Sequence, residues 1–289
     1  MIVLIDAGNT RVKAGWVDPD TGERETEPVA LSHDSLDQLS HWLAKVSPAP
    51  SKAFGVNVAG LAIEAAIEDI FHLYDCPIEW VKGESQALNV LNAYDNPTQL
   101  GPDRWISMLG LARRPHPQIS EQVGEIAQGV FPPIILASFG TATTIDTLVV
   151  DVANSAPGSL HYTFRGGLIL PGPALMRSSL ATATANLPEA QGEVTAYPTH
   201  THQAISTGIA AAQGGAVVRQ WLIGLEYYGH GPIVYASGGG WPLVKEETRH
   251  RLLYAQQQLG LPETPIEWLA TPVLDGLCAL ALQSEVTNS

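Results

Sequence analysis

The chain has 289 residues, of which 45% are hydrophobic and 15% charged, a composition that supports a packed core and argues against a disordered protein. Its 29 acidic and 15 basic residues give a net charge of −14. A surface this acidic repels polyanions, so DNA, RNA and anionic membranes are poor partners, whereas a small phosphorylated ligand needs only a few local donors.

The first part of the chain begins with two strands and then alternates helices and strands. Strands are expected at 2–5 and 12–17, separated by a turn, because both runs are rich in β-branched residues. Helices are predicted at 35–46, 61–73 and 102–113, with strands at 53–59 and 78–81. The first apolar run has no basic segment before it and ends at Asp6, which indicates a strand and not a signal peptide.

The same pattern starts again after a connecting segment at 114–129, which contains Pro115 and Pro117. The second part has predicted strands at 134–137, 143–150, 162–170, 233–237 and 266–269, and helices at 173–184, 203–228, 244–259 and 272–284. Two domains, 1–116 and 117–289, are therefore expected. Cys76 and Cys278 lack the spacing of a disulfide framework or zinc site, which is typical of reduced thiols in a cytoplasmic protein.

An internal similarity supports two related α/β domains. Leu4-Ile5-Asp6-Ala7-Gly8-Asn9-Thr10 aligns with Leu136-Ala137-Ser138-Phe139-Gly140-Thr141-Ala142, so Gly8 corresponds to Gly140. Both segments are followed by helix–strand alternation. Chance likeness of two strand-to-glycine turns is the alternative, since strands often end at glycine.

The first candidate site is the turn at 6–10. Gly8 lets a ligand approach the backbone, and the N–H groups of such a turn can hold phosphate oxygens, with Asn9 and Thr10 as further donors. Asp6 is placed to hold Mg²⁺ through water, and Lys13 is close enough to reach a phosphate. The alternative is an ordinary hairpin turn with an Asx-type hydrogen bond.

The second candidate is the turn at 138–144, where hydroxyl groups and small residues surround Gly140 and Thr141. Facing the first turn across a cleft, it would complete a phosphate clamp in which the N–H groups of Gly8 and Gly140 take part. A strand with threonines on its solvent face is the alternative. The chain has no P-loop sequence and no G-x-G-x-x-G after a strand, so neither class of nucleotide site is indicated.

The third candidate is the helix start Gly101-Pro102-Asp103-Arg104. A carboxylate is ordinary there because the helix dipole favours it. Arg104 is less expected, and its guanidinium indicates a bidentate partner such as a substrate carboxylate. Asp103 beside an alcohol could accept its proton during phosphoryl transfer.

These segments occur together in one order along the chain: Asp6–Thr10 with Lys13, Tyr94 to Arg104, Gly140 to Asp146, Gly166-Gly167 with Pro171-Gly172, and Thr184 to Pro188. In this order and spacing the chain resembles the type III pantothenate kinases, of the acetate and sugar kinase/Hsp70/actin superfamily, over nearly its whole length. The resemblance implies two duplicated ribonuclease H-like lobes, the actin-like ATPase fold, with the active site in the interlobe cleft. It also implies a cytoplasmic homodimer with pantothenate bound at the subunit contact.

The reaction implied by the resemblance is ATP-dependent phosphorylation of pantothenate to 4′-phosphopantothenate, the first step of coenzyme A biosynthesis, with Mg²⁺ bridging the nucleotide phosphates. Asp103 would be the catalytic base. The residues that would bind ATP are Asp6, Gly8, Asn9, Thr10, Lys13, Gly140 and Thr141, with Asp6 near the metal. Those that would bind pantothenate are Tyr94, Gly101, Pro102, Asp103, Arg104 and Thr184, with Arg104 on the substrate carboxylate.

One departure from the family concerns Ser138. The family usually has an aspartate there, which holds a monovalent cation such as K⁺ or NH₄⁺, and serine offers a neutral oxygen instead. Two alternatives to the pantothenate kinase hypothesis are a regulatory or accessory protein on the same scaffold and a kinase for another small hydroxy acid. Asp6, Asp103 and Arg104 are intact, which counts against an inactive kinase.

Overall fold

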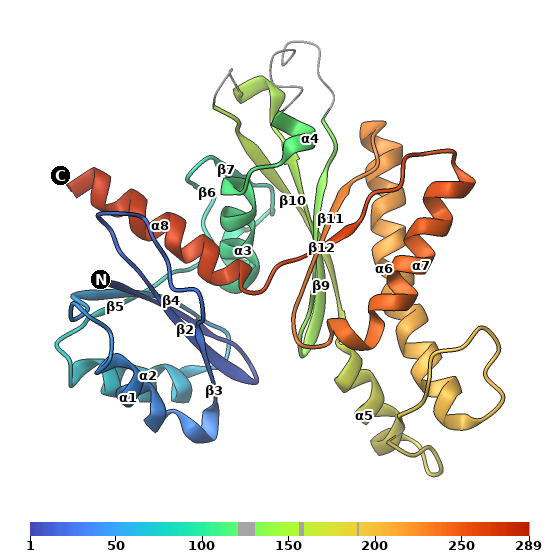
Figure 1. The fold of residues 1–289 in the computed structure, drawn as a ribbon, viewed down its shortest axis with the longest axis horizontal. Helices are drawn as coiled ribbons and strands as arrows, with labels where there is room; N and C mark the ends of the chain where they lie inside the picture. The colour runs from blue at the N-terminus through green and yellow to red at the C-terminus, as the bar shows by residue number, and fades with distance from the viewer. Residues whose placement is uncertain (121–130, 156–158, 190, 289) are drawn as a thin grey trace. The chain divides into compact units, whose positions relative to one another are not determined.

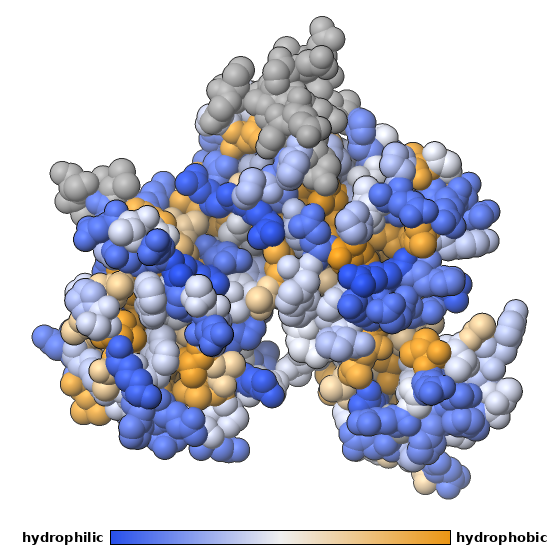
Figure 2. All heavy atoms as spheres, viewed as in Figure 1, coloured by the Kyte–Doolittle hydropathy of each residue, from blue (hydrophilic) through white to orange (hydrophobic). Residues whose placement is uncertain are grey.

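The computed structural model describes residues 1–120, 131–155, 159–189 and 191–288. It divides into two compact units, one formed by Met1–Pro115 with Thr271–Ser289 and the other by His116–Ala270. In this grouping the last helix belongs to the first unit, whereas the sequence placed it in the second domain. Hydrophilic side chains cover most of the face drawn in Figure 2. None of the helices in the described ranges is long and apolar enough to cross a membrane.

The first unit is built on a five-stranded sheet with β1 at its centre, in the order β3-β2-β1-β4-β5. The strands are β1 (Ile2–Ala7), β2 (Arg11–Val17), β3 (Val29–Ser32), β4 (Lys52–Asn57) and β5 (Ile78–Trp80). The first three are antiparallel, and β4 and β5 run parallel to β1. Every residue of β1 except Asp6 is apolar and buried, as its central place requires.

Helices cover both faces of this sheet (Figure 1). On one face, α1 (Asp37–Leu43) and α2 (Leu61–His72) contribute Leu39, Leu43, Ile67 and Phe71 to a core with Val3 and Ile5. On the other face, α8 (Pro272–Asn288) packs against β1 and against α3 (Pro102–Arg113). The short strands β6 (Gln86–Ala87) and β7 (Val90–Asn92) and the 3-10 helices η1 (His33–Ser35) and η2 (Pro97–Gln99) complete the unit.

The contact between α3 and α8 depends on two glycines. A Cβ at Gly276 would lie 1.9 Å from the Ile106 carbonyl oxygen, and one at Gly110 would lie 2.6 Å from the Gly276 nitrogen. The two backbones therefore touch, and this explains why α3 is buried along most of its length.

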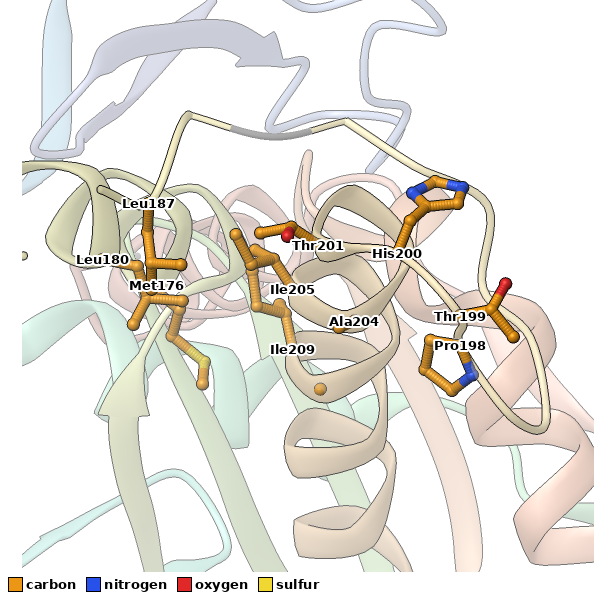
Figure 3. Close-up of a pocket in the computed structure, with 11 residues that line it drawn as sticks. Met176, Leu180, Leu187, Pro198, Thr199, His200, Thr201, Ala204, Ile205 and Ile209 are labelled. Atoms are coloured by element: carbon orange, nitrogen blue, oxygen red, sulfur yellow. The ribbon is translucent and has the colours of Figure 1, made fainter.

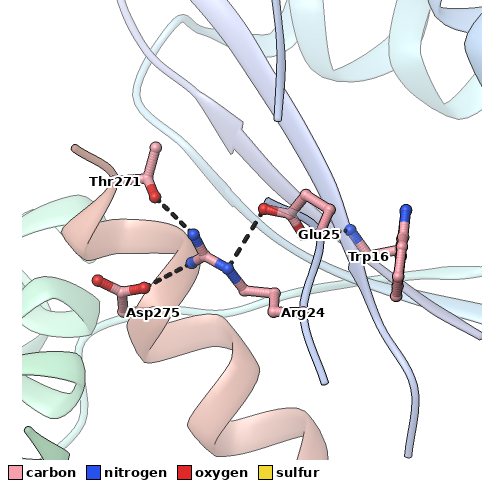
Figure 4. A network of polar contacts seen from close by, with 5 residues as sticks. All are labelled: Trp16, Arg24, Glu25, Thr271 and Asp275. Atoms are coloured by element: carbon pink, nitrogen blue, oxygen red, sulfur yellow. Dashed lines mark hydrogen bonds and ion pairs between the residues drawn. The ribbon is translucent and has the colours of Figure 1, made fainter. Parts of the chain in front are cut away.

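A network of charges fixes the beginning of α8 (Figure 4). The Arg24 guanidinium donates to Asp275 Oδ1 at 2.6 Å and to Thr271 Oγ1 at 2.7 Å. Its Nε lies 3.2 Å from Glu25 Oε1, and Glu25 Oε2 accepts the Trp16 N–H at 2.8 Å. The segment between β2 and β3 is thus joined to α8 by ionic hydrogen bonds.

The second unit repeats the strand plan of the first. Its strands are β8 (Ile134–Phe139), β9 (Ala142–Val150), β10 (Tyr162–Pro171), β11 (Ile233–Ser237) and β12 (Ile266–Trp268), in the order β10-β9-β8-β11-β12. β8, β9 and β10 are antiparallel, and β11 and β12 run parallel to β8. Order and direction match β3-β2-β1-β4-β5, so each unit has the expected ribonuclease H-like sheet and the expected internal repeat is confirmed.

The α-helices in the described part of the second unit are α4 (Pro117–Ser120), α5 (Pro173–Ala183), α6 (Thr201–Tyr228) and α7 (Trp241–Gln258). The long helices α6 and α7 pack on each other and bury Val217, Trp221, Val244 and Leu252 in a core with the central strands. α6 ends at Gly229, whose φ of 70° is the left-handed conformation that closes helices.

Most predicted elements agree with the structure within a few residues. The strands β3, β6 and β7 were not predicted, because runs of two to four residues are too short for a clear pattern. Asp6 and Ser138 were both assigned to turns but lie inside strands, β1 and β8, because they pair with Lys13 and Thr144 of the neighbouring strands. The turns themselves are shorter than expected.

Candidate active site

Asp6 lies one residue before the end of β1, directly opposite Lys13 of β2. Its Oδ2 is 4.0 Å from the Lys13 Nζ, and its side chain is 13% exposed. Burial raises the pKa of Asp6 to about 6, Lys13 lowers it and the nearby charge of Asp103 raises it further. The first unit therefore brings together Asp6, Lys13 and Asp103, which are far apart in sequence.

Asp103 stands in the first turn of α3, after the N-cap Gly101 and Pro102. A Cβ at Gly101 would lie 2.9 Å from Asp103 Oδ1, so the glycine leaves room for the carboxylate. Burial raises the pKa of Asp103, while hydrogen bonds from the backbone of Asp103 and Arg104 and the charge of Arg104 lower it. Asp103 is thus a partly buried carboxylate next to a second one, which is the setting of an acid–base residue.

Arg104 and Tyr94 form a pair in the same unit. The Arg104 Nη1 donates to the Tyr94 hydroxyl at 2.8 Å, and the guanidinium carbon lies 5.8 Å from the centre of the Tyr94 ring. Arg104 is 7% exposed. A guanidinium held in this way keeps its planar donors in one direction, which suits bidentate recognition of a carboxylate.

The two glycine turns use their own N–H groups. The Gly8 N–H donates to the Arg11 carbonyl at 3.0 Å, and the Gly140 N–H donates to the Ala142 carbonyl at 3.0 Å. Both N–H groups are therefore already used inside their own turns, so the expected phosphate clamp would have to use neighbouring donors instead. The turn residues Asn9, Thr10 and Thr141 are exposed.

Other glycines of the second unit support the turn at Gly140. The Gly172 N–H donates to the Thr141 carbonyl at 2.9 Å, and a Cβ at Gly172 would lie 2.0 Å from the Gly140 carbonyl oxygen. Gly238 has a φ of 92°, and its Cβ would lie 2.5 Å from the Phe139 carbonyl oxygen. Gly172 and Gly238 therefore allow the loops before α5 and α7 to contact this turn, because a larger side chain at either position would clash with its backbone.

The sequence comparisons point to one family. Among solved structures, the inorganic polyphosphate/ATP-glucomannokinase from Arthrobacter sp. strain KM covers 98% of both chains at 13% identity, with a TM-score of 0.42. The sequence profile of the type III pantothenate kinases matches residues 2–222. A type III pantothenate kinase from Bordetella pertussis is 48% identical over 99% of this chain and 100% of its own. One from Aromatoleum aromaticum is 35% identical over 97% and 98%.

The chain belongs to the type III pantothenate kinase family. Ser138 is the position for which the resemblance implied a monovalent-cation ligand in the family. Ser138 pairs with Thr144 on one side and with Ser237 on the other, and residues paired in this way lie on one face of a sheet. These three residues offer hydroxyl oxygens and no carboxylate, so they do not fit a cation site that depends on a negative ligand.

Thr184, the remaining residue that the pantothenate kinase resemblance singled out, is exposed and lies at the end of α5 in the second unit. Its hydroxyl donates to the Leu180 carbonyl at 2.7 Å and accepts the Leu187 N–H at 3.3 Å. Beside it, an open and mostly apolar pocket of about 620 Å³ lies between α5 and α6. Figure 3 shows Met176, Leu180 and Leu187 on one side of this pocket and Ile205 and Ile209 on the other.

Two further side chains hold the predicted turns, and sequence reasoning missed both. The His33 ring contacts the Gly8 carbonyl at 3.0 Å, and the Gln213 amide donates to the Pro171 carbonyl, next to Gly172, at 2.8 Å. Neither lies in a pantothenate kinase motif quoted above, and neither has a local sequence signal. In the described part of the chain, no group of three or more His, Cys, Asp or Glu side chains is placed to hold a metal by itself.

Proposed function

We propose that this protein transfers the γ-phosphoryl group of ATP to the primary hydroxyl of pantothenate and so produces 4′-phosphopantothenate for coenzyme A synthesis. Membership in the type III pantothenate kinase family supports the reaction. The assignment of roles to residues depends on one observation: Asp103 and Lys13 both lie near Asp6 in the first unit.

Asp103 is the proposed catalytic base. The pantothenate oxygen attacks the γ-phosphorus, the bond from that phosphorus to the bridging oxygen breaks, and ADP leaves with the bond electrons. The hydroxyl proton passes to the Asp103 carboxylate. Since the transition state of phosphoryl transfer is loose, the main work of Asp103 is to orient the hydroxyl, and its raised pKa favours accepting the proton.

Arg104 is proposed to bind the pantothenate carboxylate, and Tyr94 to hold Arg104 in place for that contact. The donor pair at 2.8 Å supports both roles, because a guanidinium fixed at one nitrogen loses little freedom when it binds a second partner. Gly101, Pro102 and Thr184 complete the proposed pantothenate contacts.

ATP is proposed to bind the turn at Gly8, Asn9 and Thr10, Lys13, and the turn at Gly140 and Thr141. Asp6 fits a metal near the phosphates, because it is a buried carboxylate whose pKa burial raises, and a bound cation would favour its charged form. The Mg²⁺ that ATP brings would be held near Asp6 and would supply positive charge next to the phosphates. A monovalent cation is not proposed as a requirement, because Ser138 supplies no carboxylate.

The active form is proposed to be a cytoplasmic homodimer, as in the family. Two features support this assignment. Cys76 and Cys278 are free thiols, as expected in a reducing compartment, and the apolar pocket between α5 and α6 lies beside the proposed pantothenate residue Thr184.

The test is an assay of phosphopantothenate formation with ATP, Mg²⁺ and pantothenate, in the presence of K⁺ or NH₄⁺ and without either. Asp103→Asn should lower kcat by at least about a hundredfold, the usual contribution of a positioned acid or base, and leave the melting temperature near that of the wild type. Asp69→Asn, an exposed carboxylate on α2, is the matched control.

Two outcomes would contradict the proposal. Failure of the wild type to form phosphopantothenate with every cation supplied would remove the activity. Wild-type turnover in Asp103→Asn would remove Asp103 from the role of base. A preference for another small hydroxy acid over pantothenate, measured as kcat/KM, would redirect the substrate assignment.

A further inference from the structure

His33 lies beside the Gly8 turn although it is 25 positions away in sequence. It begins η1, directly after β3, and the pairing of β3 with β2 places Ser32 opposite Arg11, the first residue of β2 after the turn. The half-buried His33 ring therefore reaches the turn, with its Nε2 3.0 Å from the Gly8 carbonyl oxygen. A carbonyl oxygen only accepts hydrogen bonds, so Nε2 carries the hydrogen and donates it.

This hydrogen bond fixes the orientation of one peptide group. The Gly8 carbonyl and the Asn9 N–H belong to the same planar trans peptide, and they point in opposite directions. On the other side of Gly8, the N–H is held by the Arg11 carbonyl at 3.0 Å. The His33 contact thus determines where the Asn9 N–H points, and a glycine turn without it is free to rotate that peptide.

We propose that His33 is a positioning residue for ATP: by holding the Gly8 carbonyl, it keeps the Asn9 N–H directed at a nucleotide phosphate. This inference rests on the proposed function, which assigns the turn at 8–10 to ATP. The Gly8 N–H is already used inside the turn, so the Asn9 N–H is the backbone donor whose direction His33 controls. His33 makes its contact at the nucleotide turn, and its loss should weaken nucleotide binding selectively.

The test compares His33→Phe, which keeps a ring but has no donor, with His33→Gln, whose side-chain amide can donate again. In His33→Phe, KM for ATP and Kd for a non-hydrolysable ATP analogue with Mg²⁺ should both rise about tenfold, the effect of one lost hydrogen bond. At saturating ATP, kcat and KM for pantothenate should stay within about twofold. His33→Gln should recover most of the nucleotide affinity.

His41→Phe is the matched control, because His41 is exposed and its ring contacts the Asp37 carbonyl of its own helix at 3.4 Å, away from the Gly8 turn. It should leave the analogue Kd unchanged. Melting temperatures of all three variants report whether each is folded, and should His33→Phe not fold, His33→Gln and His33→Asn carry the comparison of Kd values.

An unchanged analogue Kd in a folded His33→Phe would overturn the inference. So would equal losses in kcat and in both KM values with no recovery in His33→Gln, since that pattern describes a purely structural residue. The analogue titration does not depend on turnover. A wild type that binds the analogue and does not phosphorylate pantothenate would therefore contradict the proposed function, while the His33 comparison would still be decided by Kd.

Discussion

At the scale of single residues, the burial of Asp6 lowers the stability of the folded protein when its carboxylate is charged. Asp6 is the one ionisable residue of the central strand β1, and burial raises its pKa from 3.8 to about 6. Lys13 at 4.0 Å offsets only part of that effect. A carboxylate kept in such a place by a stable strand is typical of a site organised for a ligand cation and not for stability.

Asp6→Asn should therefore stabilise the free protein at pH 8. The folded-state pKa lies above the unfolded one, so the wild type loses stability as the pH rises from about 4 to about 6, where the unfolded chain releases its proton first. Above pH 6 the penalty is complete, about 3 kcal/mol for a shift of this size, and below pH 4 it vanishes.

Urea unfolding of the wild type and of Asp6→Asn at pH 4 and pH 8 measures this difference. The variant should be more stable at pH 8, equal to the wild type at pH 4, and inactive as a kinase. A variant less stable than the wild type at pH 8 would show that the Lys13 pair outweighs burial.

Sequence reasoning reached the residues whose chemistry stands out locally. Asp103 and Arg104 could be singled out because an arginine is unusual at a helix start, and Asp6 because a carboxylate ends an apolar run. His33 could not be found in this way, since its partner Gly8 is 25 positions away and only the pairing of β3 with β2 brings them together. Gln213 is 42 positions from Pro171 and was missed for the same reason.

At the scale of elements, the turns at strand ends carry the proposed ATP-binding residues, and glycines set how closely other elements approach these turns. The connection from β10 to α5 passes Gly172, whose N–H donates to the Thr141 carbonyl. Gln213 of α6 holds the preceding Pro171 carbonyl from the other side. The Gly140 turn is thus fixed by a loop that is itself fixed by a helix.

Gly172→Ala should disturb this arrangement, because the new Cβ would lie 2.0 Å from the Gly140 carbonyl oxygen and 2.7 Å from that of Thr141. We expect a loss of about 1–3 kcal/mol in the free energy of unfolding together with a higher KM for ATP. Gly215→Ala on α6 is the control, since nothing lies within 4 Å of its Cβ and alanine favours a helix. Wild-type stability in Gly172→Ala would contradict the packing described here.

The sequence predicted most elements because strands and helices of this length carry their own hydrophobic pattern. It predicted the duplication from the likeness of Leu4–Thr10 to Leu136–Ala142, and the strand order of each unit agrees. It did not predict that Ser138 belongs to β8, because a serine near glycine favours a turn locally and only pairing with Thr144 and Ser237 extends the strand.

At the scale of the whole molecule, the net charge of −14 has to be reconciled with a polyanionic substrate. The described geometry suggests that this is done locally, with Lys13 beside Asp6 and with backbone donors such as the Asn9 N–H. The net charge repels ATP at long range, and added salt screens this repulsion as well as the local attraction, so added salt should change ATP binding only slightly.

Oligomeric state is the remaining prediction at this scale. Light scattering during gel filtration should give twice the chain mass of 30.8 kDa, because the proposed active form is a homodimer. A fully active monomer at the concentrations of the assay would contradict that proposal. Because the measurement requires neither substrate, it is independent of the kinase assay.

The return of α8 to the first unit has a consequence for synthesis of the protein. The second unit, His116–Ala270, can emerge complete from the ribosome while the first still lacks its last helix. Until Gly276 meets Gly110, the apolar face of α3 that contacts α8 has no cover from within its own unit. The part of the protein that is made first is therefore the part that finishes folding last, and it depends on a contact between Gly110 and Gly276, which are far apart in the sequence.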